Sequence, residues 1–179
     1  MENFSEYILS EKNYLKKLEI VYYLSKKEDI FFDNSVVFKT ELARMFIDTM
    51  NIDVDKNMVL TACMLCGCKK PREPQNIDRI KGYALEGAQY LSTLGFSDRF
   101  CKMCSEVNRY NEIEEREKES DILELVDCFG GMLLHRPERE GFKPDEALIL
   151  LEERNLKGKD NIYLESFKKF VVAMEDIKI

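Results

Sequence analysis

Residues 121–136 read Asp121-Ile-Leu-Glu-Leu-Val-Asp127-Cys-Phe-Gly-Gly-Met-Leu-Leu134-His-Arg136, and this stretch decides the fold. At helical spacing one face is apolar, and the adjoining face, with Leu123, Gly130 and Leu134, is apolar too. A helix that is apolar nearly all round is predicted to be central and buried. Asp127 falls on the second face, so we expect its carboxylate to be at least partly buried. Such a carboxylate needs a metal, a cation or hydrogen-bond donors.

Helical periodicity extends over most of the chain, and alternating strand-like runs are absent. Pro144, followed by two acidic residues, is typical of a first helical turn. The sequence predicts an all-α protein of about eight helices. They cover about residues 11–26, 55–66, 79–94, 97–110, 120–134 and 144–154, with two further apolar stripes, Phe38, Leu42, Met45, Phe46 and Met50, and Leu164, Phe167, Phe170, Val171 and Met174.

Length and composition limit the functional classes. With 179 residues and 45% apolar composition, one compact core is expected. A net charge of -7 makes nucleic acid an unexpected partner, because phosphate binding needs clustered Lys and Arg. The apolar runs are too short to cross a bilayer, and the polar, acidic first residues are unlike a secretory signal. We therefore expect a cytoplasmic protein with no membrane partner.

Six cysteines, at positions 63, 66, 68, 101, 104 and 128, are expected to stay thiols in a reducing compartment. The pairs Cys63-x-x-Cys66 and Cys101-x-x-Cys104 have a spacing that zinc sites use. Both pairs lie in helical patterns, where cysteine more often packs as a small apolar residue. Core packing is therefore favoured, and a structural zinc protein remains an alternative.

Two gap-free segments carry a resemblance to a known family. Asp127-Cys-Phe-Gly-Gly-Met-Leu-Leu-His-Arg136-Pro137-Glu-Arg139 resembles the HD-GYP stretch in which a metal-binding Asp precedes an Arg-Pro-x-Arg element. Tyr83-Ala-Leu-Glu-Gly87-Ala88, with Leu94-Gly95-Phe96 after it, is similar to the family's His-Pro-x-x-Gly-Ala segment and its Leu-Gly-Phe. The resemblance implies an HD-domain-like helical bundle over residues 35–179. Residues 1–34 would be an N-terminal helical extension packed on that core.

The resemblance also implies a metal-dependent phosphohydrolase whose metal ligands are mostly missing. The family binds one or two divalent ions through His and Asp side chains. Its metal-site positions fall here on Phe38, Cys66, Gly67, Tyr83, Glu106, Val107 and Asp127, of which only Asp127 keeps the family's residue. The family's Gly-Tyr-Pro loop is also absent between Asn111 and Ile122. The chain contains one histidine, His135, expected to be a surface residue at a helix end.

These departures predict a catalytically inactive HD-GYP-like domain with no cofactor, acting in binding, scaffolding or regulation, in the context of nucleotide second-messenger signalling. Its partner would be a protein or a nucleotide, and a homodimer remains open. Lys70 and Arg136 are the predicted charge partners of Asp127 in place of metal. The main alternative is a phosphohydrolase with a remodelled metal site of Cys66, Glu106 and Asp127. The charged run 112–121 is interpreted as a solvated loop or helix extension.

Overall fold

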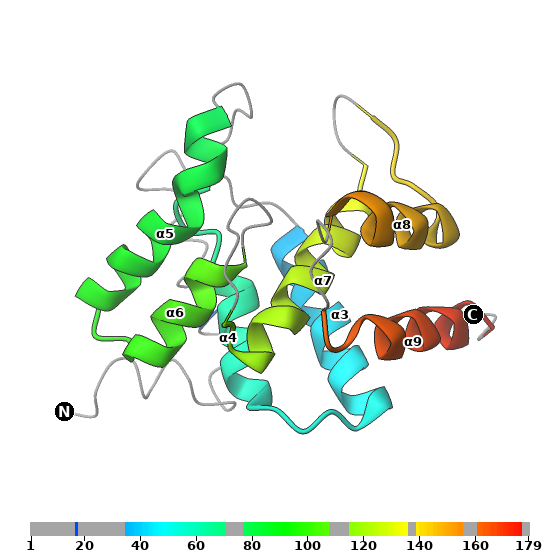
Figure 1. The fold of residues 1–179 in the computed structure, drawn as a ribbon, viewed down its shortest axis with the longest axis horizontal. Coiled ribbons are helices and arrows are strands. Elements are labelled where there is room, and N and C mark those ends of the chain that lie inside the picture. The colour runs from blue at the N-terminus through cyan, green and yellow to red at the C-terminus, as the bar shows by residue number, and fades with distance from the viewer. Residues whose placement is uncertain are drawn as a thin grey trace.

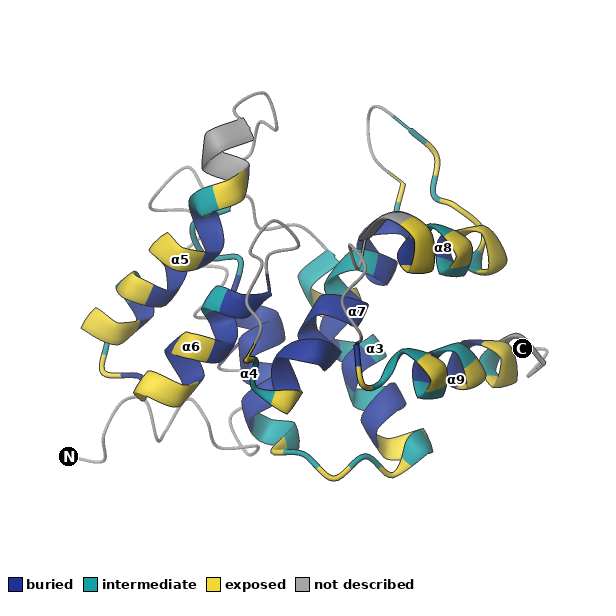
Figure 2. Cartoon of the chain, in the orientation of Figure 1, coloured by how far each residue is buried: buried dark blue, intermediate teal, exposed yellow. Residues whose placement is uncertain are grey.

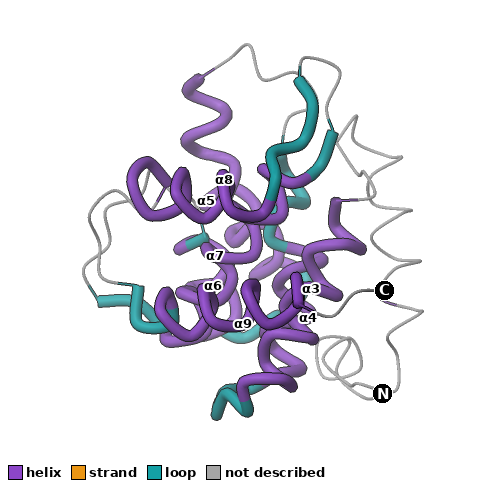
Figure 3. Tube along the Cα trace, turned by 90° about the vertical axis from the view of Figure 1, so that its right-hand side faces the viewer, coloured by secondary structure: helices purple, strands orange, loops and turns teal. Residues whose placement is uncertain are grey.

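The computed structural model describes residue 17 and residues 35–70, 77–107, 115–135, 139–155 and 161–176. Over these residues the chain is all-α, and Figure 3 shows only helices and connecting loops there. The elements, labelled as in Figure 1, are α3 (Ser35–Met50), α4 (Lys56–Leu65), α5 (Ile77–Thr93), α6 (Asp98–Glu106), α7 (Lys118–Leu133), α8 (Pro144–Leu150), the π-helix η2 (Leu151–Asn155) and α9 (Leu164–Asp176).

Most helix boundaries agree with the sequence signals. The Asp55 side chain accepts a hydrogen bond from the Met58 amide at 2.9 Å and begins α4. Ser97 begins α6 in the same way, accepting from the Phe100 amide at 3.3 Å. Pro144 occupies the first turn of α8, as predicted. These caps satisfy amide groups that a helix start leaves without partners.

Helix α7 is the central element, as its sequence predicts. It packs against α3, α4, α6, α8 and η2, and Figure 2 shows it as an almost continuously buried segment. In Figure 1 it lies between α5 and α6 on one side and α8 and α9 on the other. Every residue from Glu119 to Val126 is buried, including three carboxylates. The scaffold therefore places the most acidic part of α7 inside the protein.

An aromatic cluster joins α3, α7 and α9. The Phe167 ring centroid lies 5.1 Å from that of Phe46 and 5.2 Å from that of Phe129, both edge to face. Phe170 adds a tilted contact to Phe46 at 5.5 Å. Such geometries add to the free energy gained from burying the rings. The apolar stripe predicted for the C-terminal helix is confirmed at Phe167, Phe170 and Val171, which are all buried.

The stripe predicted for α3 is only partly right. Phe38, its first member, is exposed, whereas Lys39 and Thr40 are buried together with Ala43, Phe46 and Ile47. The buried face is thus turned toward Lys39 relative to the predicted one. A lysine can occupy such a face when its aliphatic stem is packed and its ammonium group finds a partner.

Lys17 is the one described residue of the segment 1–34. It is buried, and its ammonium group donates to the Asn57 side chain at 2.7 Å and to the Thr61 hydroxyl at 3.0 Å, both on α4. The helix predicted over 11–26 and the extension as a whole otherwise lie outside the described residues.

Candidate functional site

Asp127, the one position at which the resemblance finds the expected metal ligand unchanged, forms an ion pair with Lys39. The Lys39 Nζ lies 2.5 Å from the Asp127 Oδ1. The two side chains are 9% and 26% exposed, so the pair is largely withdrawn from water. Asp127 is therefore partly buried and charge-compensated, as its place on α7 predicts. Lys39 is neither of the two cations, Lys70 and Arg136, that the sequence predicts as partners of Asp127.

A small cavity lies beside this ion pair. It is lined by Lys39, Cys63, Cys66, Leu123, Val126 and Asp127, from α3, α4 and α7. Its volume is about 10 Å³. A single water molecule needs roughly 10–15 Å³ measured in this way, so the cavity holds one water at most. The cavity beside the ion pair is therefore too small for a nucleotide.

Gly130 allows Lys39 to cross the surface of α7. A Cβ atom at position 130 would lie 2.9 Å from the Lys39 Cγ and 3.5 Å from the Phe38 ring. The first distance is shorter than carbon atoms normally approach. Gly130 lies one helical turn after Asp127. Because glycine has no side chain, the aliphatic stem of Lys39 can pass over this position and reach the Asp127 carboxylate.

The thiols at the cavity are held in their neutral form. Burial, assisted by the nearby Asp127 carboxylate and opposed by Lys39, raises the pKa of Cys66 to about 12. Burial likewise raises the pKa of Cys63 well above its ordinary value. Metal ions bind the thiolate form of cysteine. At neutral pH both groups are thiols, and a metal ion would have to displace their protons to bind them.

The structure brings together three of the predicted site positions. Cys66 shares the cavity with Asp127, and the Phe38 ring lies against Gly130 on the same face of α7. Gly67 follows directly after Cys66, and the nearest atom to a Cβ built there is the Lys70 Cβ at 4.0 Å. Position 67 therefore has space for a side chain.

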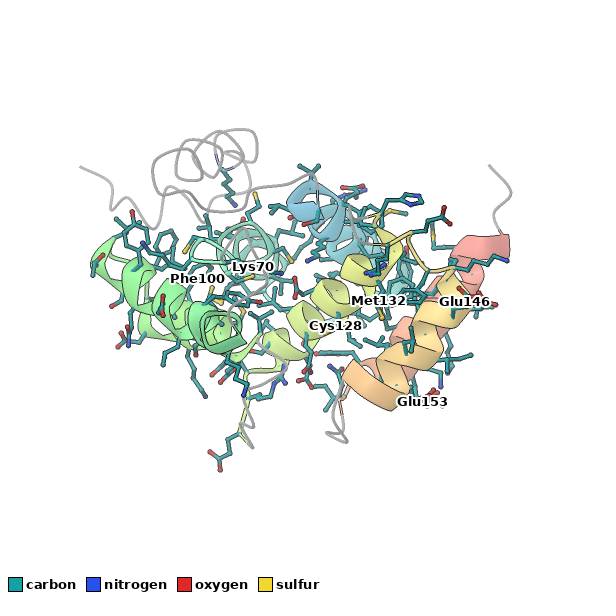
Figure 4. All side chains as sticks on the ribbon, turned by 90° about the horizontal axis from the view of Figure 1, so that it is seen from above. Lys70, Phe100, Cys128, Met132, Glu146 and Glu153 are labelled. Carbon is teal, nitrogen blue, oxygen red and sulfur yellow. The ribbon has the colours of Figure 1, made fainter. Side chains whose placement is uncertain are left out.

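Tyr83 and Lys70 meet each other between α4 and α5. Tyr83 is buried, and the Lys70 ammonium lies 5.4 Å from the centroid of its ring, a cation–π arrangement. Figure 4 shows Lys70 beside α4, and Cys128 marks the stretch of α7 that carries Asp127. The pairing of Lys70 with Asp127 stays a prediction. Arg136, the other predicted partner, lies outside the described residues.

Glu106 is engaged at the start of α7. One of its oxygens accepts hydrogen bonds from the Glu117 amide at 3.0 Å and the Ser120 hydroxyl at 2.5 Å. Ser120 precedes Asp127 by two helical turns, which is about 10 Å along the axis. Val107, the residue after Glu106, is buried at the end of α6. The structure thus places Glu106 and Val107 away from the Lys39–Asp127 pair.

A second group of buried charges surrounds the first turns of α7. Arg116 Nη1 donates to Glu124 at 2.9 Å, and its Nε lies 3.2 Å from Asp121. Asn161 Nδ2 donates to the Asp121 carbonyl at 2.9 Å. These bonds tie the segment before α9 to α7. Burial, opposed by Arg116 and Asn161, raises the pKa of Glu124.

The predicted solvated character of residues 112–121 is therefore wrong for its last three positions. Glu119, Ser120 and Asp121 are buried, at 1%, 0% and 8% exposure. Arg99 Nη2 donates to the Glu119 carboxylate at 2.9 Å. Charge density alone predicts a solvated segment, but Arg99 compensates the Glu119 carboxylate, and Arg116 and the Ile162 amide compensate that of Asp121. Arg99 and Ile162 lie far along the chain from their partners, so the local pattern does not reveal them.

The end of α7 is held by Arg139, whose role the sequence analysis missed. Its guanidinium group donates to the carbonyls of Gly131 at 2.8 Å and of Met132 at 3.0 Å. A cation at this place also complements the helix dipole. His135 is exposed just beyond α7, as predicted, and its Nδ1 accepts a hydrogen bond from the Gly141 amide at 3.3 Å.

The residues at the family's metal-site positions do not fit a divalent ion. Within the described parts of the chain, no group of three or more His, Cys, Asp or Glu side chains is arranged to hold one. The two cysteine pairs belong to the core, since Cys63, Cys66, Cys101 and Cys104 are all buried free thiols. Burial also raises the pKa of Cys104 well above its ordinary value.

Comparisons with protein-family models, with curated proteins and with solved structures find no match to this chain. Among the described helices, none has both the length and the apolar character needed to cross a membrane.

Proposed function

We propose that this protein is an HD-GYP-like domain in which an internal ion pair replaces the metal centre, and that it acts by binding a partner. The observation that carries the proposal is the 2.5 Å contact between the Lys39 ammonium and Asp127. An aspartate that would bind a divalent ion in the family here has a positive charge supplied by the chain itself.

A metal ion would have to displace Lys39 to reach Asp127. Displacement would break a short, largely buried charge-assisted hydrogen bond and leave an ammonium group without its carboxylate. The cavity of about 10 Å³ would also have to expand to admit further ligands. Both steps oppose metal binding.

The other predicted metal-site positions offer few ligands for a divalent ion. Phe38 has no ligating atom, and a metal ion would have to displace the proton of Cys66, whose pKa burial raises to about 12. Glu106 already accepts bonds from Glu117 and Ser120. Metal-assisted hydrolysis needs several ligands around an open coordination position. These residues provide two carboxylates, Asp127 and Glu106, which lie apart and already have partners of their own.

A partner-binding role suits a scaffold that is well packed while its former reaction centre is closed. The closed cavity favours a protein partner over a nucleotide at this position. We place the protein in the cytoplasm, because its six cysteines are all free, which suits a reducing compartment. Coupling to nucleotide second-messenger signalling is what the family resemblance implies, and it belongs to the proposal.

Elemental analysis of the purified protein, combined with a turnover assay, tests this proposal. The substrate is bis(p-nitrophenyl) phosphate, a generic phosphodiester, with and without added manganese. We expect substoichiometric metal and no turnover above the rate with a Lys39→Met, Asp127→Asn control. Stoichiometric manganese with chelator-sensitive turnover would instead establish the remodelled phosphohydrolase. Stoichiometric zinc, with unfolding on chelation and no turnover, would establish a structural zinc protein.

A reverse experiment tests the correspondence of positions. The combined variant Phe38→His, Lys39→Ala, Cys66→His and Gly67→Asp restores the family's ligands around Asp127 and removes the competing ammonium. Calorimetric titration should then show manganese binding that Asp127→Ala in the same background abolishes. Circular dichroism verifies that both variants are folded. A folded variant that binds no manganese would contradict the assignment of these positions.

A further inference from the structure

An exposed apolar residue stands within an acidic face of α8 and η2. Ile149 is 56% exposed. The residues three and four positions away in both directions, Asp145, Glu146, Glu152 and Glu153, are all acidic and exposed. Residues at these spacings are neighbours on a helix surface. Figure 4 labels Glu146 and Glu153, which lie toward the two ends of this segment.

An ion pair joins helix α9 to this face. Lys168 Nζ lies 3.2 Å from the Glu152 carboxylate, so the sides of η2 and α9 that carry these residues are adjacent. Val172 lies one turn after Lys168 and is 53% exposed. Ile149 lies one turn before Glu152. The two segments run in opposite directions in Figure 1, so Ile149 and Val172 lie on the same side of the Lys168–Glu152 bridge.

Among the residues that the structure describes, Ile149 and Val172 are two of the exposed large apolar side chains. Helix α8 packs on α7 and helix α9 packs on α3, and both helices show exposed stripes on their outer sides in Figure 2. Two exposed β-branched residues on segments that an ion pair joins, with charged residues around them, are consistent with a contact site for another protein.

We propose that the outer face of α8, η2 and α9 docks a basic amphipathic helix of a partner protein. The apolar stripe of that helix would cover Ile149 and Val172, and its Lys and Arg side chains would lie against the acidic rim. Over residues 144–155 the sequence has four carboxylates and one arginine, so this segment is negative, and Asp145, Glu146 and Glu153 add to the one carboxylate, Glu152, that pairs with Lys168.

A second copy of the chain is a poorer occupant. Self-association would place the acidic rim of α8 and η2 against its own copy, in a protein whose net charge is already -7. Like charges that face each other across an interface oppose association. The inference is independent of the metal site, because no residue of this face contributes to the cavity at Asp127.

Binding of a synthetic helical peptide tests the proposal. The probe is a fluorescein-labelled amphipathic peptide of leucine and lysine, with a second peptide carrying glutamate in place of lysine. Fluorescence anisotropy should show that Ile149→Ser with Val172→Ser weakens binding of the lysine peptide by about tenfold or more. Leu85→Ser, which alters a 54% exposed leucine on α5, is the matched control and should leave binding within about twofold.

Charge variants separate this face from general attraction to an acidic protein. Asp145→Asn with Glu153→Gln should weaken binding several-fold more than Glu86→Gln, an exposed carboxylate on α5. Circular dichroism confirms that each variant is folded. Equal binding by the Ile149→Ser, Val172→Ser variant and the Leu85→Ser control would overturn the proposal. Equal binding of the glutamate peptide, or a homodimer in sedimentation experiments that the double variant abolishes, would do so as well.

Discussion

Lys39 and Asp127 each compensate the other's charge, and removing either one leaves a largely buried charge behind. Lys39→Met should lower the free energy of unfolding by about 2–3 kcal/mol, near the low end for buried pairs because Asp127 is 26% exposed. Adding Asp127→Asn should recover part of this loss, since the uncompensated carboxylate is then gone. Urea denaturation of the two single variants and the double variant measures all three values.

The matched control is Lys56→Met. Lys56 lies 2.9 Å from Asp48, but the two side chains are 32% and 43% exposed, so this pair is solvated. Its loss should cost no more than about 1 kcal/mol. Equal losses for Lys39→Met and Lys56→Met would mean that the Lys39–Asp127 pair contributes no more than a surface ion pair.

Gly130 is the second residue on which the pair depends. An alanine inside a helix normally stabilises it by about 0.5–1 kcal/mol relative to glycine. Gly130→Ala should instead destabilise the protein by about 1–2 kcal/mol, because the added carbon would lie 2.9 Å from the Lys39 stem. Thermal and urea unfolding of the variant measure this effect.

Gly82→Ala provides the comparison within helix α5. The nearest atom to a Cβ there is the Glu86 Oε1 at 3.5 Å, an ordinary contact. This variant should be neutral or slightly stabilised. If Gly130→Ala were as stable as Gly82→Ala, the lysine stem would have another route to Asp127.

The Cys66 thiol gives a chemical readout of the same site. With a pKa of about 12, it should react with iodoacetamide at about pH 8 far more slowly in the folded protein than in urea. Mass spectrometry of digested protein follows each cysteine separately, with the half-buried Cys128 for comparison. Labelling of Cys66 at the same rate in the folded and unfolded protein would show that the cavity is open.

At the scale of the element, helix α7 begins within a group of buried carboxylates. Burial raises the pKa of Glu124 above its ordinary 4.5, so the folded protein binds this proton more tightly than the unfolded chain does. Its stabilising contribution is complete below pH 4.5 and is lost as the pH rises through the raised pKa. Glu124→Gln cannot titrate, so the stability of the native chain minus that of the variant should fall over this range.

Glu117 should contribute to stability with the opposite pH dependence. A hydrogen bond from Arg99 lowers its pKa below 4.5, so its contribution is present above pH 4.5 and lost as the pH falls. Urea denaturation from about pH 3 to about pH 8 should therefore give pH dependences of opposite direction for Glu124→Gln and Glu117→Gln. A difference for Glu124→Gln that rises with pH would mean that the bond from Arg116 outweighs burial.

Periodicity predicted the helices well but assigned the buried face of α3 less well. Phe38 is predicted to lie on the buried face because it is apolar, whereas in the structure Lys39 is buried and Phe38 is exposed. A signal was present, since Lys39, Ala43 and Phe46 recur at helical spacing. A lysine is rarely assigned to a core, and its partner Asp127 lies 88 residues away, so local pattern could not join them.

For the whole molecule, the sequence predicted an all-α protein with a central α7 and a partly buried Asp127 that needs compensation. It could not identify the compensating cation, because that depends on which helices pack together. The same limit explains why Glu106 was grouped with Asp127. A correspondence of positions carries no information about the hydrogen bonds that Ser120 and Glu117 donate to Glu106.

The most direct test of the central claim is anomalous diffraction from crystals grown in manganese chloride. We predict no manganese peak within coordination distance of Asp127, with the Lys39 ammonium still bonded to that carboxylate. A manganese peak beside Asp127, with Lys39 turned away from it, would contradict the replacement of metal by the ion pair.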